Sequence, residues 1–133
     1  MVTGVDLVKE QLRVASGEKL AFRQKDIKAT GHAIECRINA EDVDAGFAPS
    51  PGLITGVHWP GGPGVRVDSH VFAGYRVPPH YDSLLAKVIA WGRDRSEALS
   101  RMARALAELR IDGVRTTAAF HQRLLQAEEF RRG

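Results

Sequence analysis

Three polar side chains alternate along one short stretch of this chain and could act on an anionic or electron-rich group. Within 65–71, Arg66, Asp68 and His70 alternate with valines and a serine, so an extended backbone would place the two sets on opposite faces. A guanidinium is always charged, and its planar fork of donors suits oxyanions and carbonyl groups that gain negative charge. The alternative is a cross-strand ion pair on a solvated sheet face, and the spacing alone favours this second interpretation.

A second candidate region follows in Val77–Ser83. Pro78 and Pro79 stiffen the backbone and remove two amide donors, so we expect this loop to have a fixed shape. Tyr81 and Asp82 could line a cleft, or they could cap the following strand through an Asx turn. The sequence alone leaves both interpretations open, with the cap slightly favoured.

Other site chemistries fit the residue pattern poorly. The five histidines lack the spacing of a zinc site, and the single cysteine cannot form a disulfide or a thiolate cluster. Gly61–Gly64 is rich in glycine, but a strand rather than a helix is expected after it, so we predict a hairpin turn and no phosphate loop. Ser69 next to His70 lacks the context of a nucleophile elbow. We therefore expect no metal site and no nucleophilic triad.

Composition favours a single globular domain with no membrane segment. The chain has 133 residues, of which 44% are hydrophobic and 26% charged, with a formal net charge of +3. Its cations alternate with carboxylates and only 7% of residues are aromatic, which disfavours a nucleic-acid surface. No apolar run could span a membrane and no signal peptide is evident, so we expect a cytoplasmic protein.

The elements expected to position the candidate residues form an α+β pattern, with helices packed against an antiparallel sheet. The compact spacing of the strands favours antiparallel pairing. In chain order we expect a helix capped by Thr3 or Asp6 and ended by Gly17, a half-buried strand over 31–39, short strands over 53–59 and 65–71, a strand over 84–91 covered on both faces, a helix capped by Asp94 and broken at Asp112-Gly113, and a last helix capped by Thr116 or Thr117.

Longer blocks of the chain resemble the C-terminal domain of biotin carboxylase. These blocks are collinear between Thr3 and about Phe130, and comprise Gly31–Asp42, Pro49–Gly52, Gly64–His70, Ala73–Tyr75, Val77–Lys87 and Ile111–Thr117. The resemblance implies a small antiparallel half-barrel sheet of the rudimentary hybrid-motif type, packed with C-terminal helices. It also implies that 1–22 is the terminal helix of an upstream ATP-grasp domain and that 23–133 is the C-terminal domain, in a fragment of a longer enzyme.

The resemblance implies a reaction and roles in it. In that family, ATP, bicarbonate and Mg²⁺ or Mn²⁺ support carboxylation of N1 of biotin, and Arg66 matches the arginine that contacts the ureido oxygen of biotin. Asp68, His70, Tyr81 and Asp82 match the surrounding segment and are supporting candidates. The family's nucleotide, metal and bicarbonate residues match no part of this chain, so we expect the segment alone to be inactive and to bind no cofactor.

The implied partners are a biotin carboxyl carrier protein or domain, a carboxyltransferase and a second copy of the enzyme. Trp91, Arg93 and Arg95 are candidates for a dimer interface because Trp and Arg are enriched at contact hot spots, although Trp91 could equally be a core residue. The parent could be an acyl-CoA carboxylase, as in fatty acid synthesis, or a pyruvate carboxylase. The alternatives are a dimerisation or interaction module and the equivalent domain of another ATP-grasp ligase, such as a purine-pathway carboxylase, which the Val77–Lys87 block disfavours.

Overall fold

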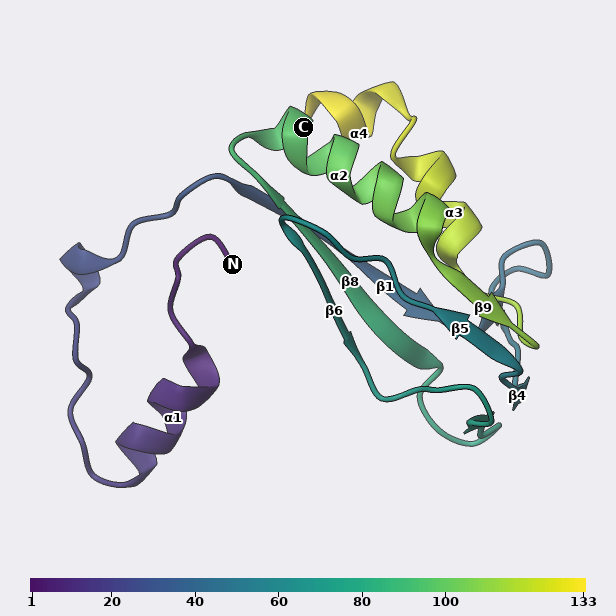
Figure 1. Cartoon of the computed structure of the whole chain (residues 1–133), viewed down its shortest axis with the longest axis horizontal. Helices are drawn as coiled ribbons and strands as arrows, with labels where there is room; N and C mark the ends of the chain where they lie inside the picture. Colours follow the sequence, from purple (N-terminus) through teal and green to yellow (C-terminus); the bar gives the residue numbers. More distant parts are fainter.

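The computed structural model describes residues 1–133, and a three-stranded antiparallel sheet forms its centre (Figure 1). The strand β8 (Leu84–Gly92) lies between β1 (His32–Asn39) and β6 (Val65–Ser69). In this register, Val88 lies opposite Cys36 on one side and opposite Val67 on the other. Every second residue of β1 from Ile34 to Ile38 is buried, which confirms the half-buried strand that the alternation predicts.

Three further pairs of short strands are also antiparallel. They join β2 (Glu41–Asp42) to β3 (Ala48–Pro49), β4 (Gly52–Leu53) to β7 (Arg76–Val77), and β5 (Gly56–His58) to β9 (Arg110–Asp112). A small buried cluster lies among them and comprises Ala40, Ile54, Val71, Val77 and Leu85. The expected antiparallel α+β architecture is therefore confirmed.

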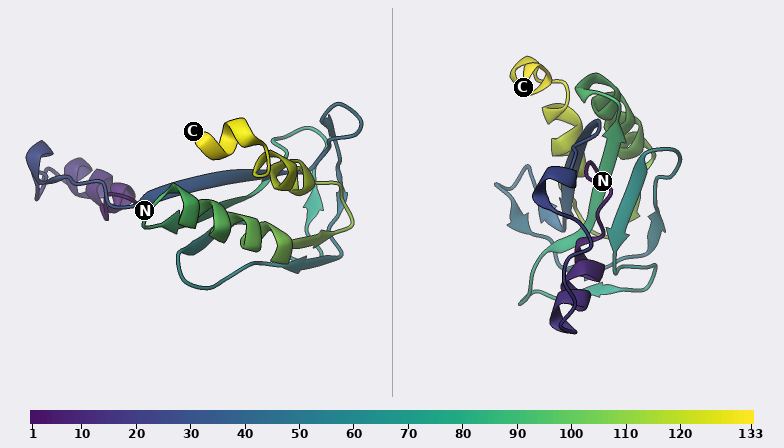
Figure 2. Two further views of the ribbon diagram at one scale, coloured as in Figure 1. Left: turned by 90° about the horizontal axis from the view of Figure 1, so that it is seen from above. Right: turned by 90° about the vertical axis from the view of Figure 1, so that its left-hand side faces the viewer.

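The helices α2 (Arg95–Glu108), α3 (Ala118–Leu124) and α4 (Glu128–Arg132) gather on one side of the sheet (Figures 1 and 2). The Asp94 carboxylate caps α2 by accepting from the amide of Glu97 at 2.8 Å, as the capping pattern predicts. The main core lies between α2 and the sheet, where Met102 and Leu106 of α2 meet Val88 and its buried neighbours. One face of the sheet is thereby covered.

The helix α1 (Leu7–Ala15) and the short 3₁₀ helix η1 (Gln24–Asp26) stand away from the sheet (Figure 2). Asp6 caps α1 by accepting from the amide of Lys9 at 3.0 Å, and Gly17 follows its end with φ of 86°, both as expected. No residue of α1 is buried, and Leu7 and Leu12 are 70% and 65% exposed. None of the helices has the length and hydropathy that a membrane crossing requires.

Two expectations around the glycine-rich turn are wrong. The stretch 53–59 is not one strand, because its hydrogen-bond partners change at buried Ile54. Ile54 bonds to Tyr75 and Gly74, just before β7, whereas the next residue, Thr55, donates to the carbonyl of Asp112 in β9. Gly61–Gly64 is not a hairpin turn, because β5 pairs with β9 and β6 with β8. Pro60 and Pro63 lack amide donors for a hairpin ladder, and Gly61 instead accepts from Arg104 of α2.

Two further expectations need correction. The strand β8 is not covered on both faces: its burial alternates, with Lys87 and Ile89 only half-buried. Thr117 precedes α3 as predicted, but its side chain caps no helical amide. Its hydroxyl instead donates to the carbonyl of Arg37 and accepts from the amide of Asn39, both at 3.0 Å. The Thr117 hydroxyl bonds to the edge of β1 and not to a helical amide, because the Arg37 carbonyl and the Asn39 amide at that edge would otherwise lack partners.

Candidate functional site

The sheet face opposite α2 is the best candidate for a site, because it presents charged side chains on a rigid support. Arg66 and Asp68 of β6 lie two residues apart, so both belong to the face that alternates with half-buried Val65 and Val67. Arg66 lies opposite Ile89 of β8, which in turn lies opposite Glu35 of β1. Asp68 lies opposite Lys87 of β8, which in turn lies opposite Arg37 of β1.

Arg66 and Asp68 form an ion pair in which Nε of Arg66 donates to Oδ1 of Asp68 at 2.8 Å. The side chains are 59% and 42% exposed, so water screens the pair and it adds little to stability. The hydrogen bond to Asp68, and then its charge, raise the pKa of Arg66 above its ordinary value. Because Asp68 takes Nε, both terminal nitrogens of Arg66 remain free of partners in the chain and could bind a planar acceptor.

The N-terminal segment forms a second boundary beside Arg66. A shallow hollow of about 500 Å³ is lined by Arg66 together with Met1, Gly4, Val5, Asp6, Leu7 and Val8. The negative charge of Asp6 also contributes to the raised pKa of Arg66, after the larger effects of Asp68. Sequence reasoning missed this neighbour, because residues 6 and 66 are distant in the sequence and no local pattern relates them.

The other predicted site residues do not join Arg66. His70 lies beyond the end of β6, exposed, and packs edge-on against Tyr75 with ring centres 5.1 Å apart. Tyr81 is 85% exposed. Asp82 accepts from the amide of Leu84 at 2.9 Å, which is the Asx turn that served as the alternative interpretation. The only side-chain partner of Arg66 among the predicted site residues is therefore Asp68.

A polar contact that the sequence did not indicate holds the loop of Tyr81 and Asp82. The hydroxyl of Ser83 donates to Oε1 of Glu41 at 2.5 Å, and the side-chain amide of Asn39 donates to the same oxygen at 3.1 Å. The backbone carbonyl of Ser83 also accepts from Ala40 at 2.7 Å. Glu41 therefore fixes the entry to β8, although nothing in its local spacing suggests this role.

The three candidate interface residues have different environments. The indole of half-buried Trp91 donates to the carbonyl of Thr30 at 2.8 Å. The side chain of Arg93 is 82% exposed and its Nε donates to Glu97 at 3.0 Å. The amide of Arg93, and then its side chain, hydrogen-bond to Glu97 and hold the pKa of that carboxyl below its ordinary value. Arg95 points elsewhere, toward His32 and the carbonyl of Phe130.

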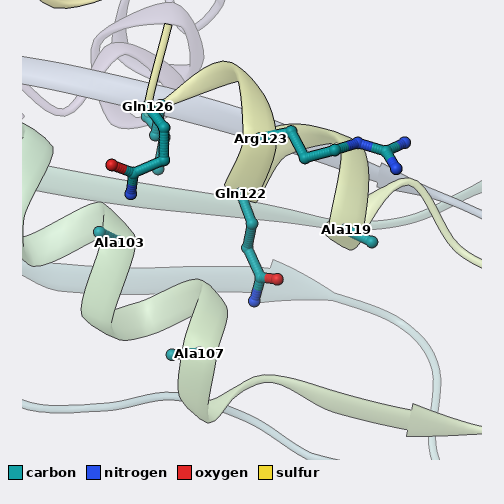
Figure 3. A pocket seen from close by; sticks show the side chains of 7 residues that line it. Ala103, Ala107, Ala119, Gln122, Arg123 and Gln126 are labelled. Carbon is teal, nitrogen blue, oxygen red and sulfur yellow. The ribbon is translucent and has the colours of Figure 1, made fainter.

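A separate groove of about 510 Å³ runs between α2 and α3 (Figure 3). Ala103 and Ala107 of α2 line one side of it, and Gln122 of α3 spans it by donating to the carbonyl of Leu106 at 2.8 Å. The groove contains a single charged residue, Arg123, which Figure 3 shows directed away from α2. No group of three or more His, Cys, Asp or Glu side chains in the chain is placed to hold a metal ion.

The whole chain is similar in sequence to known proteins. The family model described as the biotin carboxylase C-terminal domain matches residues 35–133. Over all 133 residues, the chain is 62% identical to a pyruvate carboxylase subunit of Methanothermobacter thermautotrophicus and 59% identical to the biotin carboxylase of Pseudomonas aeruginosa. It covers 27% and 29% of those proteins, and so spans less than a third of their length.

Solved structures agree with the sequence comparisons. The biotin carboxylase domain dimer of Hydrogenobacter thermophilus 2-oxoglutarate carboxylase, in complex with MgADP, ADP and bicarbonate, superposes with a TM-score of 0.97 at 47% identity. The biotin carboxylase subunit of a pyruvate carboxylase gives the same TM-score at 45% identity. Each match covers 99% of this chain and 29% of the solved chain.

Proposed function

The chain belongs to the family of biotin carboxylase C-terminal domains, and from this premise we propose that it forms the biotin-facing side of a carboxylation site. The reaction of the complete enzyme would be the ATP- and bicarbonate-dependent carboxylation of biotin N1. The observation that carries the proposal is Arg66, which is held by Asp68 on an open sheet face with both terminal nitrogens free.

Arg66 would act on the ureido oxygen of biotin. When N1 loses its proton, negative charge develops on that oxygen, and a guanidinium already in place stabilises the charge without reorganising. Asp68 would serve as the positioning residue, because its hydrogen bond to Nε fixes the plane of the guanidinium. The β6 backbone, bonded along its length to β8, supplies a rigid support for both side chains.

The remainder of the enzyme would supply the groups for nucleotide, metal and bicarbonate. The donor set of this chain does not fit a magnesium site, since no three of its carboxylate, imidazole or thiol groups gather together. We therefore assign no step to a metal within this segment. Arg66, Asp68 and the hollow beside the N-terminal segment are the parts of the site that the chain itself offers.

Residues 1–22 would belong to the preceding ATP-grasp domain, and 23–133 would form the C-terminal domain. The support for this division is that α1 buries no residue against the rest of the chain. We also propose that a biotin carboxyl carrier presents biotin to Arg66 and that a carboxyltransferase uses the carboxylated product. The identity of the final acceptor is left open, because the relatives include both a pyruvate carboxylase and proteins named only as biotin carboxylases.

Substitution of Arg66 in the complete carboxylase tests the proposal. We expect Arg66→Gln to lower the biotin-dependent kcat by about 10²–10³, the cost of removing one donor that stabilises a developing oxyanion. Asp68→Ala should lower kcat less, and Arg66→Lys should rescue only part of the loss because a lysine lacks the planar fork. ATP cleavage in the absence of biotin should remain, which would show that the variants are folded.

The chain contains a matched control for this experiment. Arg110 and Asp112 of β9 have the same spacing, and Nε of Arg110 lies 3.2 Å from Oδ2 of Asp112. Both arginines are exposed, so Arg110→Gln removes an equivalent surface ion pair away from the proposed site. If Arg66→Gln and Arg110→Gln reduce kcat equally, Arg66 has no special role and the proposal is wrong.

A second function, contact between two copies, is favoured by Trp91 and Arg93. Arg93 is largely exposed and is held in place by Glu97, while a solved relative is a dimer of biotin carboxylase domains. Arg95 is a weaker candidate because its guanidinium is engaged with His32 and Phe130. Sedimentation of the complete enzyme should show a weaker dimer for Arg93→Glu than for the wild type, whereas unchanged association would exclude Arg93 from the contact.

A further inference from the structure

Two apolar hollows lie next to each other beside α3. The first is the groove of about 510 Å³ between α2 and α3, and the second, of about 330 Å³, is lined by the end of α2, by β9 and by α3. Ala119 and Gln122 of α3 line both hollows, so the two adjoin. The second hollow is also mostly apolar, with Leu109, Ile111 and Val114 among its lining residues. We call the two hollows together the α3 groove.

The only charged residues that line the α3 groove are arginines. Arg123 lines the first hollow, Arg110 and Arg115 line the second, and no aspartate or glutamate lines either one. This composition is local, because 16 acidic residues nearly balance 19 lysines and arginines over the whole chain. Arg115 lies just before α3 and Arg123 is close to its end, so the groove has a cation near each end of this helix.

Two of the three arginines form no ion pair within the chain. Arg110 is paired with an aspartate of its own strand. The side chains of Arg115 and Arg123 are exposed and have no such partner. At the end of α2, Glu108 is paired with Arg104. The positive charges of Arg115 and Arg123 are therefore available to another molecule.

The α3 groove is already formed in the chain by itself. The side-chain amide of Gln122 donates to the carbonyl of Leu106 at 2.8 Å and joins α3 to α2. Leu106 and Leu125, which line the groove, are 1% and 5% exposed and belong to the main core. The two sides of the groove therefore rest on packed residues. A partner would not have to order them, which favours binding.

We propose that the α3 groove is a docking site for an acidic amphipathic helix of a partner protein. The apolar face of such a helix would fill the two hollows, as amphipathic helices do in hydrophobic grooves. Carboxylates beside that face would meet Arg115 and Arg123, whereas a basic helix would place like charges together. No aromatic residue lines the groove, so it lacks the stacking surface of a nucleic-acid site.

This docking site goes beyond the proposed carboxylation site and does not depend on it. The α3 groove is formed by helices that cover one side of the sheet (Figure 2), whereas Arg66 belongs to the face opposite α2. Substitutions in the groove should therefore leave the carboxylation of biotin unchanged. The activity of the complete carboxylase can then show that each variant is folded.

Binding of a designed peptide to the complete carboxylase tests the proposal. The probe is a fluorescently labelled helical peptide with leucines along one face and glutamates beside them. Its matched control has lysines in place of the glutamates. By fluorescence anisotropy, we expect the acidic peptide to have a Kd about tenfold lower than that of the lysine peptide. The difference should decrease as added salt screens the arginines.

Substitutions in the groove locate the binding. Arg115→Glu combined with Arg123→Glu should weaken binding of the acidic peptide by about tenfold or more, because both cations become like charges. Ala119→Trp should block both hollows, since Ala119 lines each of them and is itself exposed. Arg76→Glu is the matched control, because Arg76 is an exposed arginine of β7 that does not line the groove, and it should leave the affinity unchanged.

The proposal is wrong if the acidic and lysine peptides bind equally, if neither binds the complete carboxylase, or if Arg76→Glu weakens binding as much as the double substitution. Unchanged affinity in an active Ala119→Trp variant would also exclude the groove. Self-association of the complete carboxylase that Ala119→Trp abolishes would assign the groove to a second copy and contradict the proposal. Should Ala119→Trp fail to fold, the arginine variants and the two peptides alone decide the outcome.

Discussion

At the scale of single residues, Arg66 and Arg110 show that an ion pair alone does not define a site. Both lie on short strands, both pair through Nε with an aspartate two residues later, and both are exposed. Both also adjoin shallow hollows. They differ in the sheet that carries them: Arg66 lies on the open face of the three-stranded sheet, beside further charges, whereas Arg110 is on a two-stranded pair. The surroundings, more than the pair, therefore support a role for Arg66 in binding.

The ionisation of Cys36 should make the free energy of unfolding depend on pH, and this dependence distinguishes a buried core thiol from a reactive one. Burial, and then the nearby charge of Glu35, raise the pKa of Cys36 to about 11 from 9.0. The folded state retains this proton more strongly than the unfolded state, so the thiol's contribution to stability is complete below about pH 9 and is lost as the pH rises toward 11. We expect the free energy of unfolding of wild type to fall by about 2 kcal/mol more than that of Cys36→Val across this range.

Denaturant titrations at pH 8.5 and pH 10.5 would measure this difference. Comparison with Cys36→Val cancels the titration of lysines and tyrosines, which both proteins share. A thiol reagent should also leave Cys36 unmodified at pH 8 in the folded chain, because the thiolate is the reactive form. Parallel pH profiles for the two proteins, or rapid modification of the folded thiol, would contradict the assignment of Cys36 to an inert core position.

At the scale of elements, Thr117 connects α3 to the outer edge of β1. Its hydroxyl bonds to the carbonyl of Arg37 and the amide of Asn39, and its own amide donates to the carbonyl of Asn39 at 3.1 Å. Thr117→Val keeps the shape but leaves two edge groups without their partner, which should cost about 1–3 kcal/mol. Urea unfolding measures this cost, and Thr116→Val, at a neighbouring position whose hydroxyl bonds to neither edge group, should change stability by less than about 0.5 kcal/mol.

The elements with a strong local pattern could be predicted from the sequence, and those defined by distant partners could not. The alternation of β1, the cap of α2 and the glycine after α1 are local signals, and the structure confirms them. The three residues of β9 have too short a pattern to predict, and they pair with β5, a strand more than fifty residues earlier in the chain. The same non-local pairing explains why the hairpin expected at Gly61–Gly64 is wrong.

The candidate site follows the same rule. Arg66 and Asp68 lie on the same face of the sheet because alternate residues of a strand share a face, so the sequence could predict this arrangement. The hollow lined by the N-terminal segment and the role of Glu41 join residues some 40 to 60 positions apart, for which no spacing rule exists. Tyr81 and Asp82 do lie in a loop before β8, but both side chains are exposed, and that of Asp82 forms an Asx turn by accepting from the amide of Leu84.

At the scale of the whole molecule, the chain has one covered side and one open side. The helices α2, α3 and α4 lie on one face of the sheet, and α1 stands apart from it (Figure 2). Charged side chains of β1, β6 and β8 occupy the other face, and the apolar residues of α1 are exposed. Exposed apolar helices and open charged faces are typical of surfaces that another domain covers. This asymmetry agrees with relatives that are more than three times as long as the chain.

The chain by itself should therefore lack biotin carboxylase activity, even when folded. Mixed with ATP, bicarbonate, Mg²⁺ and free biotin, it should release no phosphate above background, because Arg66 would stabilise charge on a substrate that nothing else in the chain activates. Circular dichroism would first establish that the chain is folded, and a complete carboxylase with the same Arg66 environment would serve as the positive control. The prediction is wrong if the chain alone releases phosphate in a biotin-dependent way and Arg66→Gln abolishes that release. Such a result would show that this segment is sufficient for the reaction and that the nucleotide, metal and bicarbonate groups need not come from another domain.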